Sequence, residues 1–520
     1  MQNKLIEYLV PYHPEPVNGT VVIPGSKSIT NRLLFLAALT DGDVLIKGIQ
    51  RGDDSVHFMD SMEKLGVRCE VVPSQAERKP SSVQGIRAQG DGPCESPDGD
   101  GCCGCSGDSL CGSGGGGSGD GHCGSGGGSR GDGQCGSDVD AGGDACTETL
   151  GDVCSPCGSQ SVDVLVHGCG GRFPSKASID VGSGGTGARF ITSALALSDG
   201  VYQVYCSEQM KKRPMDELFR ALRSLGAEVI CLSSDGHLPA EIRGKSSGEK
   251  LEVTIDTDTS TQFLSALLLS SPLVPGGIDI HVTGSRKSGS YVGITMDCLR
   301  SFGVKSSFDK TSSIYKVQQG DNIPVSPGEI RCEPDMSAAC YFFAAAAVTG
   351  GSVTVKGTRA DSVQGDIRFL KDVLIPMGCT MSEGNEGMTV TGPSGGRLKG
   401  IDIDMQDFSD QVLTLAAIAP WADGTVSIRN VGHIRKQECD RAEAVKDCLG
   451  RAGILCDIQG DDLIIHPGET KACRIDTRED HRVAMSMSLL GLRTKGVIIE
   501  DPGCCKKTFP GYFEALETLI

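Results

Sequence analysis

One pattern recurs six times along the chain, and it constrains the fold more than any other feature. Each copy reads as a short β-type run, a polar turn, an apolar stretch of helical length, a turn with Gly or Asp, and a second β-type run. The copies occupy residues 21–48, 179–206, 253–282, 330–357, 401–430 and 474–501. Amphipathic segments such as DDSVHFMDSMEKLGV follow every copy except the last. The repeats therefore predict an α/β protein.

The first helix predicted in each repeat is apolar on nearly every side, as in LLFLAAL, FLSALLLS and YFFAAAAV. A helix of that composition is buried all round. Its N-terminus follows a turn with Ser, Thr, Asp or Gly, the residues that cap helices and leave backbone N–H groups available. We expect several of these N-termini to point at a common place, where they would attract an anion.

A segment rich in glycine and cysteine separates two β-type runs of the first repeat, VRCEVV and VDVLVHG. Between residues 91 and 160, 23 of 70 residues are Gly, and ten of the 24 cysteines fall there. Such a composition does not form an ordinary core. We expect residues 74–160 to be a low-complexity, disordered insert. The alternative is a metal or redox element built on motifs such as CCGC and CSPC.

Charge and hydropathy argue against several classes of protein. The formal net charge of −18 disfavours nonspecific nucleic-acid binding, although it leaves a local basic pocket possible. No apolar run approaches the roughly 18–20 residues of a membrane span, and the N-terminal MQNKLIEYLVPYHPEP lacks the plan of a signal peptide. The cysteines outside the insert are scattered, which is typical of reduced thiols. We expect a cytoplasmic monomer that binds neither nucleic acid nor membrane.

Cations, carboxylates and hydroxyls recur at the polar turns of the repeats. They are Lys27, Arg32, Thr186, Arg189, Ser260, Thr261, Gln262, Asp410, Asp480, His481 and Arg482, with Arg213, Glu438, Arg441 and Lys507 in three further polar segments. Arginine offers a planar fork that fits carboxylate or phosphate, and lysine offers a point charge. The pattern predicts a site for a small polyanion with two carboxylates available as base and acid. The alternatives are a helix cap at Asp410, a surface position for Glu438 and a structural role for His481.

Six motifs together resemble the 5-enolpyruvylshikimate-3-phosphate synthase family: PGSKSITNR, KKRPMDEL, STQFLSALL, HIRKQECDR, DTREDHRVAM and DPGCCKKTFPGYF. They occur in order over nearly the whole chain outside the insert. The resemblance implies an α/β (α+β) fold, a two-domain inside-out α/β barrel built from six βαβαββ-type repeats, three per domain. Domain one would comprise residues 1–24 and 333–520, and domain two would comprise residues 25–332, with the insert inside it.

The resemblance also implies a reaction. The family transfers the enolpyruvyl group of phosphoenolpyruvate to the 5-hydroxyl of shikimate 3-phosphate by addition–elimination and releases phosphate, in the shikimate pathway to chorismate and the aromatic amino acids. It needs no metal ion and no organic cofactor. Two rival interpretations are the related transferase that acts on UDP-N-acetylglucosamine and a catalytically impaired binding protein whose Cys-rich insert is the functional part.

The matching motifs assign roles to individual residues. Asp410 matches the general base, Glu438 the acid that protonates the methylene carbon, and Lys27 a catalytic residue that reaches both substrates. The residues matching the shikimate 3-phosphate site are Lys27, Ser28, Arg32, Ser260, Thr261, Gln262, Ser288, Asp410 and Gln437. The residues matching the phosphoenolpyruvate site are Lys27, Gly185, Arg213, Gln262, Arg441, Arg482 and Lys507. Gln437 departs from the family pattern, which has Lys before the acidic residue, and we expect it to weaken shikimate 3-phosphate binding.

Overall fold

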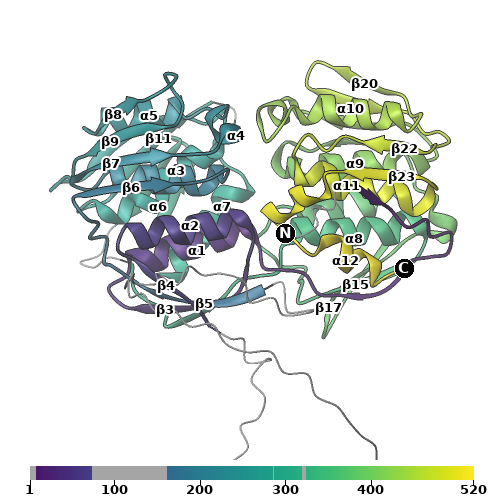
Figure 1. The fold of residues 1–520 in the computed structure, drawn as a ribbon, viewed down its shortest axis with the longest axis horizontal. Coiled ribbons are helices and arrows are strands. Elements are labelled where there is room, and N and C mark those ends of the chain that lie inside the picture. The colour runs from purple at the N-terminus through teal and green to yellow at the C-terminus, as the bar shows by residue number, and fades with distance from the viewer. Residues whose placement is uncertain (1–6, 73–160, 285, 319–323) are drawn as a thin grey trace, which may run out of the picture. The chain divides into compact units, whose positions relative to one another are not determined.

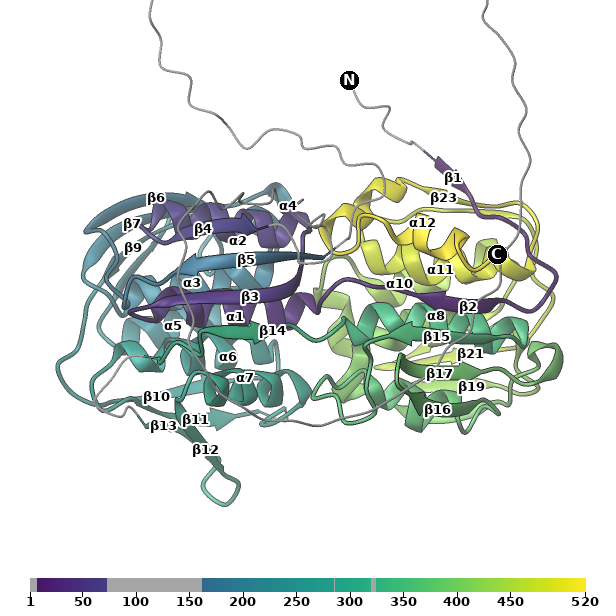
Figure 2. The same ribbon diagram turned by 90° about the horizontal axis from the view of Figure 1, so that it is seen from below.

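The structure is a computed structural model that describes residues 7–72, 161–284, 286–318 and 324–520. Within these residues the fold is mixed α/β, with six sheets that each combine parallel and antiparallel strand pairs (Figures 1 and 2). The predicted insert, residues 74–160, lies outside the described residues. No helix in the described part of the chain has the length and apolar character that crossing a membrane requires.

Three of the sheets enclose a hydrophobic core formed by residues between Ile29 and Cys332. In pairing order, the first sheet is β14 (Glu329–Arg331), β3 (Asp43–Gln50), β5 (Ser161–His167) and β4 (Arg68–Val72). The second is β6 (Lys176–Asp180), β7 (Gly200–Tyr205), β9 (Ala240–Gly244) and β8 (Glu228–Cys231). The third is β10 (Leu251–Asp256), β11 (Ile278–Thr283), β13 (Ile314–Gln318) and β12 (Lys305–Asp309).

Helices fill the space between these sheets. The central ones, α1 (Lys27–Leu39), α3 (Gly185–Ala196) and α6 (Thr261–Ser270), pack against one another. The others are α2 (Asp53–Lys64), α4 (Glu208–Lys211), α5 (Asp216–Ser224), α7 (Ser290–Ser301) and the 3₁₀ turn η2 (Ser271–Leu273). Nearly every residue of the three central helices is buried, because their side chains are apolar or small on all sides.

The other three sheets enclose a second core, formed by residues 10–23 and 336–519. In pairing order they are β16 (Thr380–Gly384), β17 (Gly387–Thr391), β15 (Ser352–Lys356) and β2 (Asn18–Val21); then β18 (Ile401–Asp404), β19 (Val426–Arg429), β21 (Asp462–Ile465) and β20 (Cys456–Gln459); and finally β1 (Glu7–Leu9), β23 (Val497–Glu500) and β22 (Cys473–Ile475).

The second core also has three central helices that contact one another: α8 (Met336–Thr349), α9 (Val412–Ile418) and α11 (His481–Arg493). The remaining helical segments are α10 (Arg441–Arg451), α12 (Tyr512–Glu517), the π-helix η3 (Phe369–Leu374), and the 3₁₀ segments η4 (Ser394–Gly396), η5 (Gln406–Gln411), η6 (Ala419–Trp421), η7 (Gly432–Lys436) and η8 (Pro502–Lys507). Together the six central helices are the apolar stretches of the six repeats, so the prediction that these stretches form buried helices is confirmed.

The chain passes between the two cores at two adjacent segments. The backbone of Gly25 forms an antiparallel bridge with Pro334. Beside it, the N–H of Ser26 donates to the carbonyl of Glu333 at 2.7 Å, and the N–H of Asp335 donates to the carbonyl of Pro24 at 2.9 Å. These bonds hold the N-termini of α1 and α8 next to each other, which brings residues of both cores to one place.

Candidate active site

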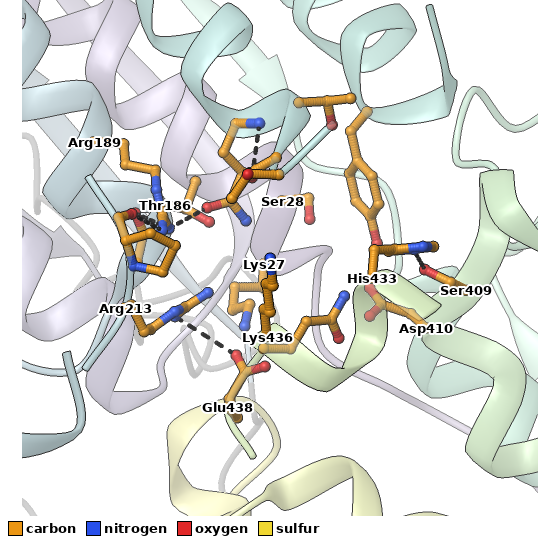
Figure 3. Close-up of a pocket in the computed structure, with 18 of the residues that line it drawn as sticks. Lys27, Ser28, Thr186, Arg189, Arg213, Ser409, Asp410, His433, Lys436 and Glu438 are labelled. Carbon is orange, nitrogen blue, oxygen red and sulfur yellow. Dashed lines mark hydrogen bonds and ion pairs between the residues drawn. The ribbon is translucent and has the colours of Figure 1, made fainter. Parts of the chain in front are cut away.

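One cavity collects the first turns of many helices (Figure 3). The helices α1, α2, α3, α6, α7, α10 and α11 each contribute a first-turn residue to its wall: Lys27, Asp54, Gly185, Thr261, Tyr291, Arg441 and Arg482. The predicted gathering of helix N-termini is therefore confirmed. Because the N-terminal end of a helix carries partial positive charge, such a cavity favours anions even before side chains are considered.

Most of the predicted site residues line this cavity. They are Lys27, Ser28, Arg32, Gly185, Arg213, Ser260, Thr261, Gln262, Asp410, Gln437, Glu438, Arg441 and Arg482. Lys507 is not on the wall, but its Nζ lies 3.8 Å from Oε1 of Glu438. Ser288 is exposed in the turn before α7 and is not among the lining residues. In its place Tyr291, in the first turn of α7, reaches the cavity.

The cavity is strongly cationic. Eight Lys and Arg side chains line it against three carboxylates, so positive charges exceed negative ones by five; the cations are Lys27, Arg32, Arg189, Arg213, Arg286, Lys436, Arg441 and Arg482, and the acids are Asp54, Asp410 and Glu438. Burial, and then the charge of Arg286, lower the pKa of His433 to about 4, so this side chain is neutral near pH 7. The excess charge matches the predicted polyanion site.

Asp410 lies at the end of η5 between two arginines. Its Oδ1 accepts from Arg441 Nη1 at 3.1 Å, and its Oδ2 accepts from Arg482 Nη2 at 3.0 Å and from the hydroxyl of Tyr291. Burial alone would raise the pKa of this carboxyl, but the charges of Arg482 and Arg441 outweigh burial and hold the pKa below its usual value. Asp410 is therefore ionised at neutral pH and lies in a position to accept a proton.

Glu438 is the second carboxylate of the centre and has different neighbours. Its Oε2 accepts from Arg441 Nη2 at 2.9 Å, while its Oε1 lies 3.8 Å from both Arg213 Nη1 and Lys507 Nζ. Burial favours the neutral acid, but Arg441, Arg213 and Lys507 hold the pKa well below its ordinary value. One arginine thus joins the two carboxylates, since Arg441 bonds both and its Nε also donates to Asp480 at 2.8 Å.

Lys27 connects the cavity with both cores. Its Nζ lies 3.5 Å from Oδ2 of Asp54, and its backbone N–H donates to Oδ2 of Asp335 at 3.1 Å. The other carboxylate oxygen of Asp54 is buried with no hydrogen-bond partner among the described residues. Lys27 is only partly engaged, because a 3.5 Å ion pair is long, and its ammonium remains available to a ligand.

Two arginines are buried beside the cavity without a carboxylate partner among the described residues. Arg32 is 1 % exposed, and it donates to Thr295 Oγ1 at 2.8 Å and to the carbonyl of Ser28 at 2.8 Å. Burial lowers its pKa to about 10, so the side chain stays charged. Arg189 donates to Gln262 Oε1 at 2.6 Å and to the carbonyl of Pro214 at 3.0 Å. A buried charge paired only with neutral groups is costly, and an anionic ligand would offset that cost.

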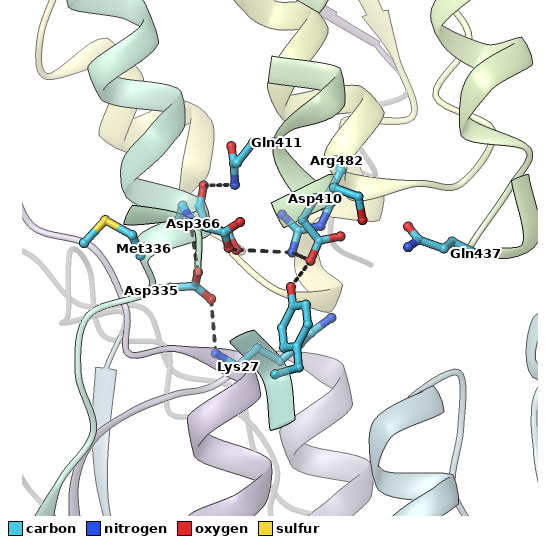
Figure 4. A network of polar contacts seen from close by, with 12 residues as sticks. Lys27, Asp335, Met336, Asp366, Asp410, Gln411, Gln437 and Arg482 are labelled. Carbon is cyan, nitrogen blue, oxygen red and sulfur yellow. Dashed lines mark hydrogen bonds and ion pairs between the residues drawn. The ribbon is translucent and has the colours of Figure 1, made fainter. Parts of the chain in front are cut away.

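A polar network behind Asp410 reaches α8 (Figure 4). Arg482 lies 3.0 Å from Asp410 and, through Nη2, 3.5 Å from the hydroxyl of Ser337, which in turn donates to the buried carboxylate of Asp366. Burial, and then the nearby charge of Asp410, raise the pKa of Asp366 to about 7. Arg482 is thus held between two carboxylates, only one of which is on the cavity wall.

Eight lining residues were not among the candidate residues of the sequence analysis: Asp54, Pro214, Thr259, Arg286, Tyr291, Ser409, His433 and Lys436. Asp54 looked like an ordinary first-turn acid of an amphipathic helix. Tyr291 and Arg286 belong to a turn from which only Ser288 was singled out. His433 opens the motif HIRKQECDR, and its Nε2 lies 2.8 Å from Ser409 Oγ. For His433, that motif was the one feature of the sequence that could have indicated a place in the site, because the residue lies five positions before Glu438.

Comparisons with known proteins agree with this geometry. The model of the EPSP synthase (3-phosphoshikimate 1-carboxyvinyltransferase) family matches residues 11–91 and 136–516. The chain is 34 % identical over 512 residues to the 3-phosphoshikimate 1-carboxyvinyltransferase of Trichormus variabilis, covering 98 % of each protein. It is 30 % identical over 520 residues to the chloroplastic 3-phosphoshikimate 1-carboxyvinyltransferase of Brassica napus, covering 97 % of this chain and 83 % of that protein.

Solved structures show the same fold. An EPSP synthase from Acinetobacter baumannii matches with a TM-score of 0.66 at 20 % identity, covering 99 % of this chain and 97 % of that chain. The enolpyruvyl transferase NikO from Streptomyces tendae matches with a TM-score of 0.64 at 13 % identity. The family model and the sequence relatives span nearly the whole chain, and the chain therefore belongs to the EPSP synthase family.

Proposed function

We propose that this chain transfers the enolpyruvyl group of phosphoenolpyruvate to the 5-hydroxyl of shikimate 3-phosphate and releases phosphate. The observation that carries the proposal is the cationic cavity with two carboxylates joined by Arg441. Each substrate has one carboxylate and one phosphate, and a phosphate monoester carries about −1.5 to −2 at pH 7, so the two substrates bring about −5 to −6. The cavity's excess of five positive charges, with Lys507 next to it, is close to that total.

The substrate-binding residues follow from family membership and from their place on the wall. For shikimate 3-phosphate we propose Lys27, Ser28, Arg32, Ser260, Thr261, Gln262 and Asp410, with Ser288 and Gln437 at the margin. For phosphoenolpyruvate we propose Lys27, Gly185, Arg213, Gln262, Arg441, Arg482 and Lys507. Three residues of the phosphoenolpyruvate set, Arg213, Arg441 and Lys507, contact or approach Glu438. This neighbourhood supports a role for Glu438 at phosphoenolpyruvate, and Asp410 belongs to the proposed shikimate 3-phosphate set.

Asp410 is the proposed general base. It is ionised in the ligand-free cavity, and Arg441 and Arg482 orient both of its oxygens. A carboxylate held in this way can take the proton from the attacking hydroxyl without first losing one of its own. The arginines also neutralise the phosphate that leaves as the tetrahedral adduct breaks down.

Glu438 is the proposed acid, and it can act as one only after it has gained a proton. In the ligand-free cavity it is ionised, because Arg441, Arg213 and Lys507 stabilise its charge. Phosphoenolpyruvate would bring its own negative charges to Arg213 and Lys507. Those charges compete with Glu438 for the same cations and raise its pKa, so that it can hold the proton that the methylene carbon receives. Substrate binding would thus prepare the acid.

We also propose the finer organisation that the family implies: an inside-out α/β barrel fold with three repeats in each of two domains, residues 1–24 with 333–520 and residues 25–332. The two separate cores and the paired connections at Gly25 and Pro334 support these boundaries. The chain would act as a cytoplasmic monomer without metal or cofactor. All 14 described cysteines are free thiols, which is in keeping with a reducing compartment.

The test is phosphate release by the purified full-length protein supplied with phosphoenolpyruvate and shikimate 3-phosphate, with the organic product identified by mass spectrometry. We expect phosphate and the enolpyruvyl ether in equal amounts, and none when shikimate 3-phosphate is replaced by UDP-N-acetylglucosamine. Binding of both substrates without turnover would instead support a catalytically impaired binding protein. The relatives that carry the transferase name over nearly the whole chain disfavour that outcome.

A further inference from the structure

Residue 437 contributes no charge to the cavity, although it lies beside Glu438. It is a glutamine, and its Oε1 accepts a hydrogen bond from Arg441 Nη1. The amide oxygen is therefore used to orient the arginine that joins the two carboxylates. Gln437 is also a weaker ligand for phosphate than a cation at this position would be, because a neutral amide binds a phosphate dianion less tightly than a charged donor does.

Arg286 is a cation of the cavity wall that forms no ion pair with a carboxylate of the described residues. It lies in the turn between β11 and α7, where it lines the cavity. The carboxylates of Asp407, Asp410 and Asp258 act on it electrostatically, but none of the ion pairs between described residues includes Arg286. The residue is partly buried, so its guanidinium has lost part of its hydration, and this burial lowers its pKa below the ordinary value. A partly dehydrated cation without an ion pair is the state that an incoming anion relieves.

The residues around Arg286 indicate which of the two substrates it would bind. Its charge acts on His433 and on the hydroxyl of Tyr291, and both of these lie around Asp410. Arg286 and Thr259 also line a second, more open cavity that shares His433 and Lys436 with the first one. Thr259 directly precedes Ser260 at the N-terminus of α6. By contrast, Arg213 and Lys507 lie at Glu438, the proposed position of phosphoenolpyruvate.

We propose that Arg286 binds the phosphate of shikimate 3-phosphate and supplies the positive charge that Gln437 does not. The proposal rests on the proposed function of the cavity and adds a residue to it. An arginine suits the role, because two N–H groups of its planar fork bond two phosphate oxygens at once. It also explains how a chain with Gln437 keeps a complete set of charges for its two substrates.

Lys436 is the competing cation. It directly precedes Gln437 and lines both cavities. Its side chain is exposed, however, whereas that of Arg286 is partly buried. An exposed ammonium keeps its hydration and contributes less to binding than a partly dehydrated guanidinium does. The comparison of Lys436→Ala with Arg286→Gln therefore belongs in the same experiment.

The experiment is calorimetric titration of the full-length protein with shikimate 3-phosphate and, separately, with shikimate, both without phosphoenolpyruvate. We expect Arg286→Gln to weaken shikimate 3-phosphate roughly ten- to a hundredfold, the effect of losing a charge-assisted bidentate contact. Affinity for shikimate, which lacks the phosphate, should change less than twofold. The matched control is Lys287→Gln in the same turn, since Lys287 is exposed, bonds Ser313 Oγ at 3.1 Å and does not line the cavity. It should bind both ligands as the parent does.

A second variant tests whether the two positions share one role. Adding Gln437→Lys to Arg286→Gln should recover at least half of the lost binding free energy, whereas Gln437→Lys alone should gain severalfold at most. The proposal is overturned if Arg286→Gln leaves shikimate 3-phosphate binding within twofold of the parent, if it weakens shikimate equally, or if Lys436→Ala costs more than Arg286→Gln. The parent's turnover in the phosphate-release assay separates these outcomes from failure of the proposed function, which would show no turnover in the parent.

Discussion

Arg441 is the residue on which the polar centre depends. It is 1 % exposed and bonds Asp410, Glu438 and Asp480. A buried guanidinium that bonds three carboxylates holds all three in a fixed arrangement, whereas each carboxylate alone constrains the guanidinium less. The two carboxylates on the cavity wall are therefore held at set positions, as their proposed roles as base and acid at two different atoms would require.

Substitutions of the two carboxylates should slow different chemical steps of the reaction. We expect Asp410→Asn and Glu438→Gln each to lower kcat by about 10² to 10⁴, with smaller effects on KM, because each removes a proton acceptor or donor and keeps its hydrogen-bonding shape. Single-turnover kinetics that follow phosphate release, together with deuterium incorporation from solvent into the methylene carbon, would assign the steps. Glu438→Gln should suppress deuterium incorporation. An unchanged kcat with a large rise in KM would show instead that these residues only bind substrate.

Asp366 should make stability depend on pH in an unusual direction. Its folded-state pKa of about 7 lies above the ordinary value of 3.8, so between these values the folded protein holds a proton that the unfolded chain releases. Stability from this group is greatest at low pH and is lost as pH rises toward 7. Asp366→Asn removes that loss. The difference in melting temperature, variant minus parent, should therefore be about 1 to 3 °C larger at pH 8 than at pH 5.

The control for this pH effect is Asp372→Asn. Asp372 pairs with Arg368 at 2.7 Å in a half-exposed position. Its removal should give a difference in melting temperature that hardly changes between pH 5 and pH 8. If Asp366→Asn behaves in the same way, then the carboxyl of Asp366 is ionised throughout this range and the argument from its burial is wrong.

At the level of residues, the sequence was sufficient to predict a site residue that stands in a chemically informative pattern. It was insufficient for a residue that only folding brings to the cavity wall. Lys27 and Glu438 stand in recognisable motifs and Asp410 stands at the polar turn of the fifth repeat, and the structure places all three at the cavity. Tyr291 and Arg286 reach it because α7 begins where it does, and no local pattern indicates that. Ser288 is the reverse case, because the family resemblance selected it and the turn leaves it exposed.

At the level of elements, α3 begins at a residue that two arginine side chains approach closely. Gly185 opens α3, and a Cβ placed on it would collide with the guanidinium of Arg213 and lie 2.6 Å from Arg189 Nη1. Both arginines would have to move. The glycine is thus required by close approach and not by a left-handed backbone.

Gly185→Ala should therefore raise the KM for phosphoenolpyruvate by roughly tenfold to a hundredfold, since displacing a binding group by about 1 Å has effects of that size. The affinity for shikimate 3-phosphate should change much less. The matched control is Gly293→Ala, because Gly293 lies inside α7 with open space where its Cβ would be. It should leave KM unaltered and keep or slightly raise the melting temperature. Equal effects from both variants would mean that Gly185 is not close to the phosphoenolpyruvate site.

The elements themselves were largely predictable, because the apolar stretches are long and follow one scheme. The exceptions have local causes. The fifth repeat enters its helix through the 3₁₀ segment η5, with a kink at Phe408, so its α-helical part shrinks to Val412–Ile418. The segment Phe369–Leu374 is a π-helix, although its apolar spacing indicated an ordinary one. Hydrophobic periodicity shows which face is buried, but it does not distinguish such variants of helical hydrogen bonding.

At the level of the whole molecule, the cavity is lined by residues from elements of both cores. The Gly- and Cys-rich insert, by contrast, connects the two strands of one hairpin. β4 and β5 pair as an antiparallel hairpin, with Arg68 opposite His167 and Val72 opposite Asp163. β5 also pairs with β3 on its other side. The two β-type runs predicted beside the insert are thus strands, and they pair with each other. The family model leaves residues 92–135 unmatched, so the centre of the insert lies outside the part of the chain that the model describes.

Removing residues 74–160 and joining the strands with a short glycine-rich turn should therefore leave a folded enzyme whose kcat and KM lie within about threefold of the parent. The hairpin keeps both of its strand partners, and closing a shorter loop costs less conformational entropy than closing a long one. A second variant, with all ten insert cysteines replaced by serine, tests the metal or redox alternative, since it keeps the length and removes the thiols. Both variants should match the parent in phosphate release and in melting temperature. A shortened protein that is insoluble, or more than tenfold slower, would show that the fold uses the insert, and loss of activity in the serine variant alone would assign the function to its thiols.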